Sequence, residues 1–249
     1  MSKKTLAGIT AGTLCLIVAI AALTHDPAHT FIYHLWNGDQ SPSSLAVTQA
    51  DTPSESSAVT ALAALPIKGR APKTGYERES MFGKAWKDTD HNGCDTRNDI
   101  LKRDLTHKSY REGTHGCVVI SGVLDDPYSG ERIHFTRGQG TSELVQIDHV
   151  VALSDAWQKG AQQLNQSQRE QLANDPLNLL AVDGALNQKK SDADAATWLP
   201  PNKTYRCEYV SRQIAVKKKY HLWVTETERD AMLTVLHGCT NPTLPADFS

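Results

Sequence analysis

The sequence lacks a strong excess of either charge and any internal repeat. Among its 249 residues, Lys and Arg number 26 and Asp and Glu 28, which gives a net charge of −2. This balance excludes a histone-like polycation and an acidic solvating tail. No unit of about 20–50 residues recurs, which excludes solenoids and propellers. A mean hydropathy of −0.43 excludes a polytopic membrane protein.

A single long apolar run follows the basic pair Lys3-Lys4 and extends from Leu6 to Leu23. As a helix it would measure about 27 Å, close to the thickness of the hydrocarbon core of a bilayer. The positive-inside rule then places the rest of the chain outside the cytoplasm. Ala19-Ile20-Ala21 resembles a signal-peptidase site, whereas the length of the run favours an uncleaved anchor. We therefore expect residues 1–24 to be a signal peptide or a membrane anchor, and the protein to be secreted or held on the outer face of the cytoplasmic membrane.

The segment after this run is rich in Ser, Thr, Pro, Ala and Gln from Asp39 to about Pro66. Such a composition buries too little apolar surface to offset its ordering entropy. The sequence therefore predicts a disordered linker over residues 25–66 and a folded domain over residues 67–249.

Apart from Cys15, the chain has four cysteines, and an even number in an exported domain indicates two disulfides. They are Cys94, Cys117, Cys207 and Cys239. Of the three possible pairings we favour the sequence-local one, Cys94–Cys117 and Cys207–Cys239. Free buried thiols and a structural zinc site are the alternatives, although the chain contains no C-x-x-C motif.

Hydrophobic periodicity, turn residues and capping boxes predict an α+β domain with a small antiparallel sheet and flanking helices. The predicted strands are Cys117–Val123, Ile133–Thr136, Leu144–Ile147 and Leu177–Val182. The predicted helices are Glu77–Trp86, Asp95–Leu105, Ser154–Leu164, Tyr205–Tyr220 and Thr225–His237. A further helix begins at the capping box formed by Ser167 and Glu170 and ends at Asn174. A short helix includes Asn187 and Lys190.

Candidate site residues lie on three of these elements. Asp148-His149 ends one apolar strand, Asn178 begins the next strand-like run, and Asn187 lies on the helix that follows. This order matches the ββα-metal, or HNH, nuclease site. Asp148 and Asn187 offer hard oxygen ligands for Mg²⁺. His149 can accept a proton from water near neutral pH, and we expect Asn178 to orient the loop or the His149 ring.

Longer segments carry a specific family resemblance. They are GCDTRNDILKRDL (Gly93 to Leu105), CVVISGVLDDPYSG (Cys117 to Gly130), VQIDHVVALSDAWQKGA (Val145 to Ala161), LANDPLNLLAVDGALNQKKSD (Leu172 to Asp192) and TWLPPN (Thr197 to Asn202). From Tyr76 to Cys239 the chain resembles exported HNH endonucleases that share the C-terminal domain of GmrSD-type restriction enzymes.

The resemblance implies that Asp148 and Asn187 are metal ligands, that His149 is the general base, and that Asn178 is the middle, orienting residue. Asn187 stands where many HNH enzymes carry His, which favours Mg²⁺ or Mn²⁺ over zinc. The implied activity is phosphodiester hydrolysis in DNA, leaving 5′-phosphate and 3′-hydroxyl ends, with little sequence specificity. A non-catalytic, envelope-tethered DNA-binding protein and a nuclease acting mainly on RNA are the alternatives.

Two cationic features are candidates for phosphate binding. Arg97 could clamp a phosphate with two hydrogen bonds or pair with Asp95 or Asp99. Lys189 and Lys190 follow Asn187 closely and are candidate phosphate contacts. We interpret Lys217–Lys219 as a solvated helix face.

Overall fold

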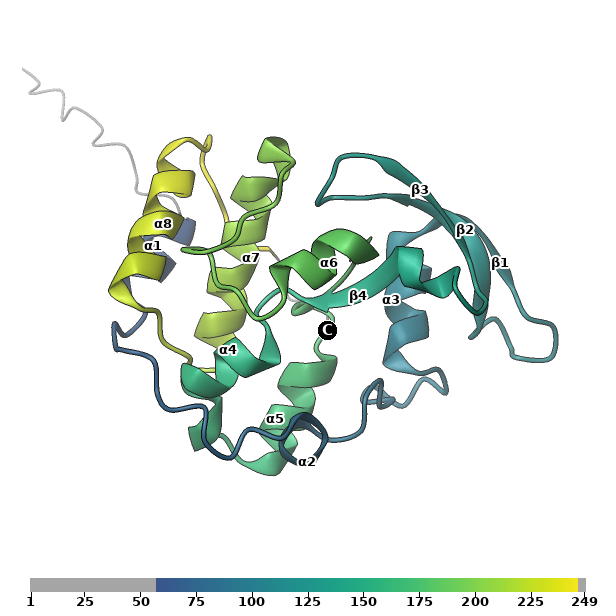
Figure 1. The fold of residues 1–249 in the computed structure, drawn as a ribbon, viewed down its shortest axis with the longest axis horizontal. Helices are drawn as coiled ribbons and strands as arrows, with labels where there is room; N and C mark the ends of the chain where they lie inside the picture. Colours follow the sequence, from purple (N-terminus) through teal and green to yellow (C-terminus); the bar gives the residue numbers. More distant parts are fainter. Residues whose placement is uncertain (1–56, 246–249) are drawn as a thin grey trace, which may run out of the picture. The chain divides into compact units, whose positions relative to one another are not determined.

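The computed structural model describes residues 57–245, which form an α+β domain with two small antiparallel sheets (Figure 1). The helices are α1 (Ser57–Ala63), α2 (Arg78–Phe82), α3 (Thr96–Asp104), α4 (Leu153–Gln158), α5 (Gln166–Asn174), α6 (Gly184–Lys190), α7 (Arg206–Lys219) and α8 (Glu226–His237). The strands are β1 (Thr106–Tyr110), β2 (Val119–Asp125), β3 (Arg132–Thr136), β4 (Val145–His149) and β5 (Leu179–Asp183).

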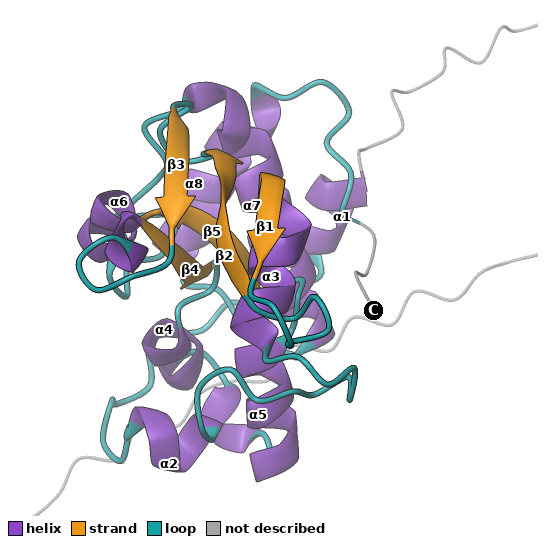
Figure 2. Ribbon diagram, turned by 90° about the vertical axis from the view of Figure 1, so that its right-hand side faces the viewer, coloured by secondary structure: helices purple, strands orange, loops and turns teal. Residues whose placement is uncertain are grey.

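Strands β1, β2 and β3 form one antiparallel sheet in that order, and β4 pairs with β5 in a second (Figure 2). In the second sheet Val145 pairs with Asp183 and His149 pairs with Leu179. Helix α6 begins at the residue after β5, so β4, β5 and α6 form a strand–strand–helix unit. Helices α4 and α5 lie between β4 and β5 in the chain, where the sequence predicted helices.

The β5 strand is buried on both faces, which explains its uninterrupted apolar sequence. Side chains alternate between the two faces of a strand. Leu179 and Ala181 pack with α3 and the three-stranded sheet, whereas Leu180 and Val182 pack with α1, α7 and α8. Apolar residues are therefore required at successive positions of β5, and the β4–β5 pair is held from both sides.

Helix α7 is the central helix of the domain and is buried from Tyr209 to Lys217. One of its faces packs with α1 and α8, which lie beside it on the left of Figure 1. Ala215 and Val216 pack with α2, α4 and α5 on another side. Lys217 has no exposed surface, so the prediction of a solvated face is wrong at this residue.

The predicted linker extends too far toward the C-terminus, because its last residues belong to the folded domain. Residues 57–63 form α1, and Ala58, Ala61, Leu62 and Leu65 are buried against α7 and α8. Their spacing of three and four residues is that of an amphipathic helix. Residues 1–24 and the linker up to residue 56 lie outside the described residues. Within residues 57–245, no helix has the length and apolar character needed to cross a bilayer.

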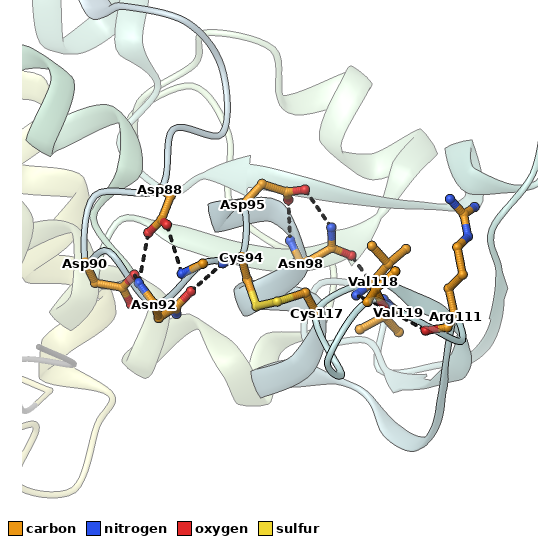
Figure 3. Close-up of a disulfide and its surroundings, with 12 residues drawn as sticks. Asp88, Asp90, Asn92, Cys94, Asp95, Asn98, Arg111, Cys117, Val118 and Val119 are labelled. Carbon is orange, nitrogen blue, oxygen red and sulfur yellow. Dashed lines mark hydrogen bonds between the residues drawn. A yellow bond between two sulfur atoms is a disulfide. The ribbon is translucent and has the colours of Figure 1, made fainter.

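Two disulfides close the domain, and both have the sequence-local pairing that we favoured. Cys94 is bonded to Cys117, which joins the loop before α3 to the chain entering β2 (Figure 3). Cys207 is bonded to Cys239, which joins the start of α7 to the residues after α8.

Candidate active site

The strand–strand–helix unit depends on a close approach that only glycine permits. A Cβ atom on Gly184 would lie 1.9 Å from the carbonyl oxygen of Glu143. The preceding residue, Asp183, accepts a hydrogen bond from the backbone amide of Leu186 at 2.7 Å and caps the N-terminus of α6. Helix α6 is thereby packed against the chain that enters β4, and Asn187 lies beside the strand that carries Asp148 and His149.

A cleft of about 360 Å³ opens at the end of β4. Asp148, His149 and Asn187 all line it. The other polar side chains along its walls are Tyr76, Arg78, Ser154, Ser191 and Asp192. The structure therefore brings together three of the predicted site residues, from the end of one strand and from the helix that follows its partner.

Asp148 is almost fully buried and has a polar partner on each carboxylate oxygen. Tyr128 donates a hydrogen bond from its hydroxyl to Oδ2 at 2.5 Å, and Lys190 Nζ lies 3.0 Å from Oδ1. Burial raises the pKa of Asp148, although the charge of Lys190 and the hydrogen bond from Tyr128 oppose this shift. A carboxylate has about four lone-pair positions. Each oxygen of Asp148 therefore retains capacity for a cation.

His149 is held in one orientation by its surroundings. Its Nε2 lies 2.8 Å from the carbonyl oxygen of Ala173, and its ring stacks on Trp86 at a centroid distance of 6.2 Å. A carbonyl only accepts hydrogen bonds, so Nε2 carries the proton and Nδ1 has the free lone pair. Burial, together with the positive charge of Arg78, lowers the pKa of His149 to about 3. The imidazole is therefore neutral at physiological pH, with Nδ1 unprotonated.

Asn178 is completely buried and holds the chain that follows His149. Its Oδ1 accepts a hydrogen bond from the amide of Val151 at 2.8 Å, and its Nδ2 donates to the carbonyl oxygens of Val151 and Leu172, both at 3.3 Å. It does not line the cleft. Of the two roles expected for Asn178, the structure agrees with orientation of the loop; the His149 ring is held by Ala173 and Trp86 instead.

Asn187 is oriented by a neighbour on β4. Its Nδ2 donates a hydrogen bond to Gln146 Oε1 at 2.9 Å, which leaves Oδ1 as the atom available to a cation. Gln146 and Asp148 are two residues apart on the strand and share one of its faces. Within residues 57–245, no three His, Cys, Asp or Glu side chains are gathered so as to hold a metal ion. A cation in the cleft would thus rest on one carboxylate and one amide oxygen, a donor set that suits Mg²⁺ or Mn²⁺ completed by water and phosphate.

The two adjacent lysines of α6 have opposite environments. Lys189 is exposed, as a phosphate contact requires. Lys190 has no exposed surface, and its Nζ donates to the backbone carbonyl of His149 at 2.9 Å besides pairing with Asp148. The prediction that Lys190 contacts nucleic acid is therefore corrected: this lysine is an internal support of the Asp148-His149 pair.

Arg97 is also placed differently from the expectation. Its guanidinium donates to the carbonyl oxygen of Val145 at 3.2 Å, at the opposite end of β4 from His149. It does not line the cleft, and none of the ion pairs among the described residues joins it to Asp95 or Asp99. A different arginine lies at the cleft: Arg78, an exposed residue at the start of α2, lines it beside His149.

Arg78 and Tyr128 were not singled out from the sequence. Arg78 is one of several basic residues before the recognisable motifs, and Tyr128 lies in a segment that reads only as a turn. Nothing in the local pattern of either residue indicates that the fold brings it to Asp148 or His149.

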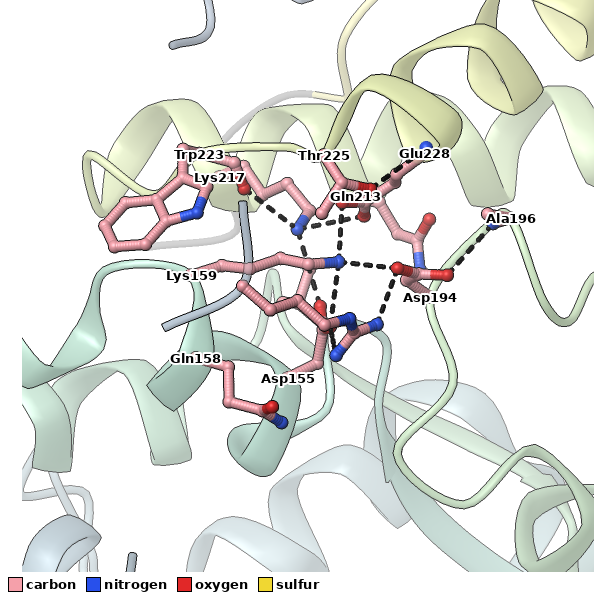
Figure 4. Close-up of polar contacts among 12 residues, drawn as sticks. Asp155, Gln158, Lys159, Asp194, Ala196, Gln213, Lys217, Trp223, Thr225 and Glu228 are labelled. Atoms are coloured by element: carbon pink, nitrogen blue, oxygen red, sulfur yellow. Dashed lines mark hydrogen bonds and ion pairs between the residues drawn. The ribbon is translucent and has the colours of Figure 1, made fainter. Parts of the chain in front are cut away.

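The wall of the cleft formed by α4 and the chain after α6 is held by a buried cluster of charges (Figure 4). Lys159 Nζ lies 2.8 Å from Asp155, 2.7 Å from Asp194 and 2.6 Å from Glu228. Lys217 contacts Glu228 at 3.0 Å, and Arg70 contacts Asp155 and Asp194. Asp155 follows the cleft residue Ser154 directly, so the cluster fixes the helix that carries that residue.

Comparison with known proteins identifies the family. Residues 95–235 match the C-terminal domain of GmrSD restriction endonucleases. An uncharacterized secreted protein of Arthroderma benhamiae is 37% identical over 194 residues, which cover 77% of this chain and 89% of that protein. No solved structure matches the chain. The chain belongs to the family of GmrSD restriction endonuclease C-terminal domains.

Proposed function

We propose that this protein is an exported, divalent-metal-dependent HNH endonuclease that hydrolyses phosphodiester bonds in DNA with little sequence specificity. The observation that carries this proposal is the meeting of Asp148, His149 and Asn187 in one cleft. Family membership supports a nuclease in general. The cleft adds a carboxylate, a neutral imidazole and an amide, which are the groups that metal-assisted hydrolysis requires.

In this proposal His149 is the general base. Its Nε2 proton is committed to Ala173, so Nδ1 is the atom that takes a proton from the attacking water. Stacking on Trp86 keeps the ring in place. Asn178 is a positioning residue, because it acts only through the backbone of Val151 and Leu172.

Asp148 and Asn187 would hold the metal ion in the cleft. When bound, a divalent ion neutralises the charge that develops on the phosphate and the leaving oxygen. Tyr128 and Lys190 fix the orientation of the Asp148 carboxylate. Lys190 also reduces the net negative charge of the site, which is consistent with an ion that binds tightly only together with a substrate phosphate.

Arg78 and Lys189 are the cations best placed to contact the substrate backbone. Both are exposed, and Arg78 lines the cleft itself. A guanidinium can bind a phosphate through two parallel hydrogen bonds. The net charge of −2 provides no broad basic surface. We therefore expect a few local phosphate contacts, which carry no sequence information by themselves.

Export is proposed from three observations. The chain has an apolar run after a basic pair near its start, it has two disulfides, and its relative in Arthroderma benhamiae is a secreted protein. Disulfides persist in oxidising compartments. The mass of the mature protein, measured by mass spectrometry, distinguishes cleavage of a signal peptide after Ala21 from an uncleaved segment. An uncleaved segment would anchor the protein in the membrane.

The central test is cleavage of a supercoiled plasmid by the purified protein. We expect nicking and linearisation in Mg²⁺ or Mn²⁺ and loss of both in EDTA. Duplex DNA and RNA of matched length are digested side by side, and faster cleavage of RNA would assign the alternative substrate. Binding of DNA without cleavage under any divalent ion would favour the non-catalytic alternative and contradict the proposal.

Lys189→Ala should weaken DNA binding through one lost phosphate contact. The slope of the logarithm of the association constant against the logarithm of salt concentration should then become shallower by about 0.9. The measurement is fluorescence anisotropy of a labelled duplex between about 50 and 200 mM salt, with His149→Ala in every protein to prevent cleavage. Lys102→Ala, an exposed lysine of α3 that does not line the cleft, is the control. Equal slopes for both variants would show that Lys189 does not contact the DNA.

A further inference from the structure

The loop before α3 has a spacing of oxygen-bearing residues that has no role in the proposed nuclease cleft. Twelve residues, from Asp88 to Asp99, follow the pattern D-x-D-x-N-G-x-x-x-x-x-D. Acidic or amide side chains at the first, third, fifth and twelfth positions, with glycine at the sixth, are the signature of a calcium-binding loop. The seventh residue of such a loop contributes its backbone carbonyl, and here that residue is Cys94. The chain departs from the usual pattern at the twelfth position, where Asp replaces Glu.

The backbone already has the turn that this pattern requires. Asp88 accepts hydrogen bonds from the amides of Asn92 at 3.2 Å and Gly93 at 3.0 Å, and Gly93 has φ of +89°. Figure 3 shows Asp88, Asp90 and Asn92 gathered around this turn, beside the Cys94–Cys117 disulfide. Helix α3 begins inside the loop and carries Asp99 in its first turn.

The carboxylates of this loop have no cationic partner among the described residues. None of the ion pairs within residues 57–245 includes Asp88, Asp90 or Asp99. Asn92 Nδ2 instead donates a hydrogen bond to Asp90 at 2.9 Å. The loop thus gathers carboxylates without a paired cation.

A buried oxygen from another helix borders the same place. Asp90 and Asp99 line a cleft of about 290 Å³ together with Asn174 of α5. Asn174 is only 2% exposed, and its Oδ1 has no hydrogen-bond partner in the described protein. A buried carbonyl oxygen without a donor is unfavourable. A cation, or a water molecule bound to one, would satisfy it.

We propose that residues 88–99 form a calcium site separate from the Asp148–Asn187 cleft. The ligands are the carboxylates of Asp88, Asp90 and Asp99, the amide oxygen of Asn92 and the carbonyl oxygen of Cys94. Calcium accepts six to eight oxygen ligands in flexible geometry, whereas magnesium prefers a strict octahedron that keeps several waters. A loop that supplies five protein ligands therefore selects calcium.

Calcium binding requires a local rearrangement of the loop side chains. The acidic side chains of the described residues do not yet surround one point, and the amide of Asn92 presents its NH₂ group to Asp90. The amide oxygen of Asn92 already accepts a hydrogen bond from the backbone amide of Cys94 at 2.8 Å. An amide oxygen has a second lone pair, so it can keep this bond and bind the ion when the side chain turns its NH₂ group away from Asp90. The Cys94–Cys117 disulfide anchors the middle of the loop, and the hydrogen bond from Thr96 to the carbonyl of Lys87 joins its second half to the residue before Asp88. We expect a Kd of about 10⁻⁴–10⁻³ M, the range of extracellular calcium modules.

The test is calorimetric titration of CaCl₂ into the full chain after treatment with EDTA and dialysis. We expect one calcium ion per chain at this loop, and loss of that binding in the double variant Asp88→Asn/Asp90→Asn. Asp125→Asn, an exposed carboxylate of β2 paired with Arg132, is the control and should bind like the wild type. Unchanged calcium binding in the double variant would overturn the proposal.

Two further variants distinguish loss of the calcium site from misfolding and from calcium binding in the catalytic cleft. Asp99→Glu restores the longer carboxylate at the twelfth position and should lower the Kd for calcium; an unchanged or higher Kd contradicts the site. Asn187→Ala should retain the calcium ion of the loop even where it abolishes DNA cleavage. Loss of calcium binding in Asn187→Ala would place the ion in the cleft and overturn the proposal. These results are measured without DNA, so they stand apart from the test of nuclease activity.

Discussion

His149→Ala is expected to reduce DNA cleavage by about 10²–10⁴-fold, the usual contribution of a general base. The ring is neutral, its Nε2 proton is donated to Ala173, and its Nδ1 keeps the lone pair that a general base would use. Alanine removes that atom and leaves Asp148 and Asn187 in place. The measurement is the rate of plasmid nicking at saturating Mg²⁺, with circular dichroism to verify that the variant is folded.

The matched control is His134→Ala, which removes an exposed imidazole from β3, away from the cleft. Its cleavage rate should equal that of the wild type. If His149→Ala retains EDTA-sensitive cleavage at a wild-type rate, His149 is not the base, and the neutral imidazole beside Trp86 has only a structural role. Loss of helical signal in His149→Ala would instead be followed by His149→Gln, which keeps a polar side chain of similar length without the basic nitrogen.

The strands and helices that surround the cleft could be predicted from local sequence patterns. The uninterrupted apolar run at 177–182 predicted a strand, and the structure shows why the run is uninterrupted: alternate residues of β5 enter different clusters. The strand that ends in Asp148-His149 and the helix that carries Asn187 were predicted for similar reasons. Thr225 caps α8 as the capping-box pattern indicates, accepting from the amide of Glu228.

Other elements have weak local signals and were missed. Strand β1 has the polar sequence THKSY and is held by pairing with β2 rather than by an apolar face. Helix α1 is short and rich in alanine, so its composition resembled that of the linker before it. The capping box of α5 consists of Asn165 and Gln168, two residues before the predicted pair, because Asn and Gln serve as well as Ser and Glu.

The burial of particular charged residues was the feature least predictable from the sequence. Lys159, Lys190 and Lys217 have no exposed surface, yet sequence patterns place lysine on the outside almost without exception. Each is stabilised by carboxylates from distant parts of the chain; Glu228, for example, is 69 residues after Lys159. Local sequence contains no information about such a partner. For this reason Lys190 was assigned to the substrate interface and Tyr128 was overlooked.

Lys159→Met should lower the free energy of unfolding by about 3–5 kcal/mol, the usual cost of breaking a buried ion pair from one side. Methionine fills a similar volume but leaves Asp155, Asp194 and Glu228 with only Lys217 and Arg70 as cations. Although burial acts in the opposite direction, the charges of Asp155 and Glu228 raise the pKa of Lys159. The measurement is urea unfolding at neutral pH. Lys218→Met, an exposed lysine of the same helix as Lys217, should change stability little.

A charge-balanced double variant and the pH dependence of stability distinguish the electrostatic contribution of Lys159 from its contribution to packing. In the double variant Lys159→Met/Glu228→Gln one cation and one anion are removed together, so it should be more stable than Lys159→Met alone. In the wild type, hydrogen bonding and charge from Lys159 outweigh burial and lower the pKa of Asp194 to about 2. That stabilisation is present above the unfolded value of about 3.9 and is lost as the pH falls through about 2. The deficit of Lys159→Met should therefore be complete at neutral pH and shrink in acid; a deficit that is the same at every pH would mean that packing, not charge, holds this wall of the cleft.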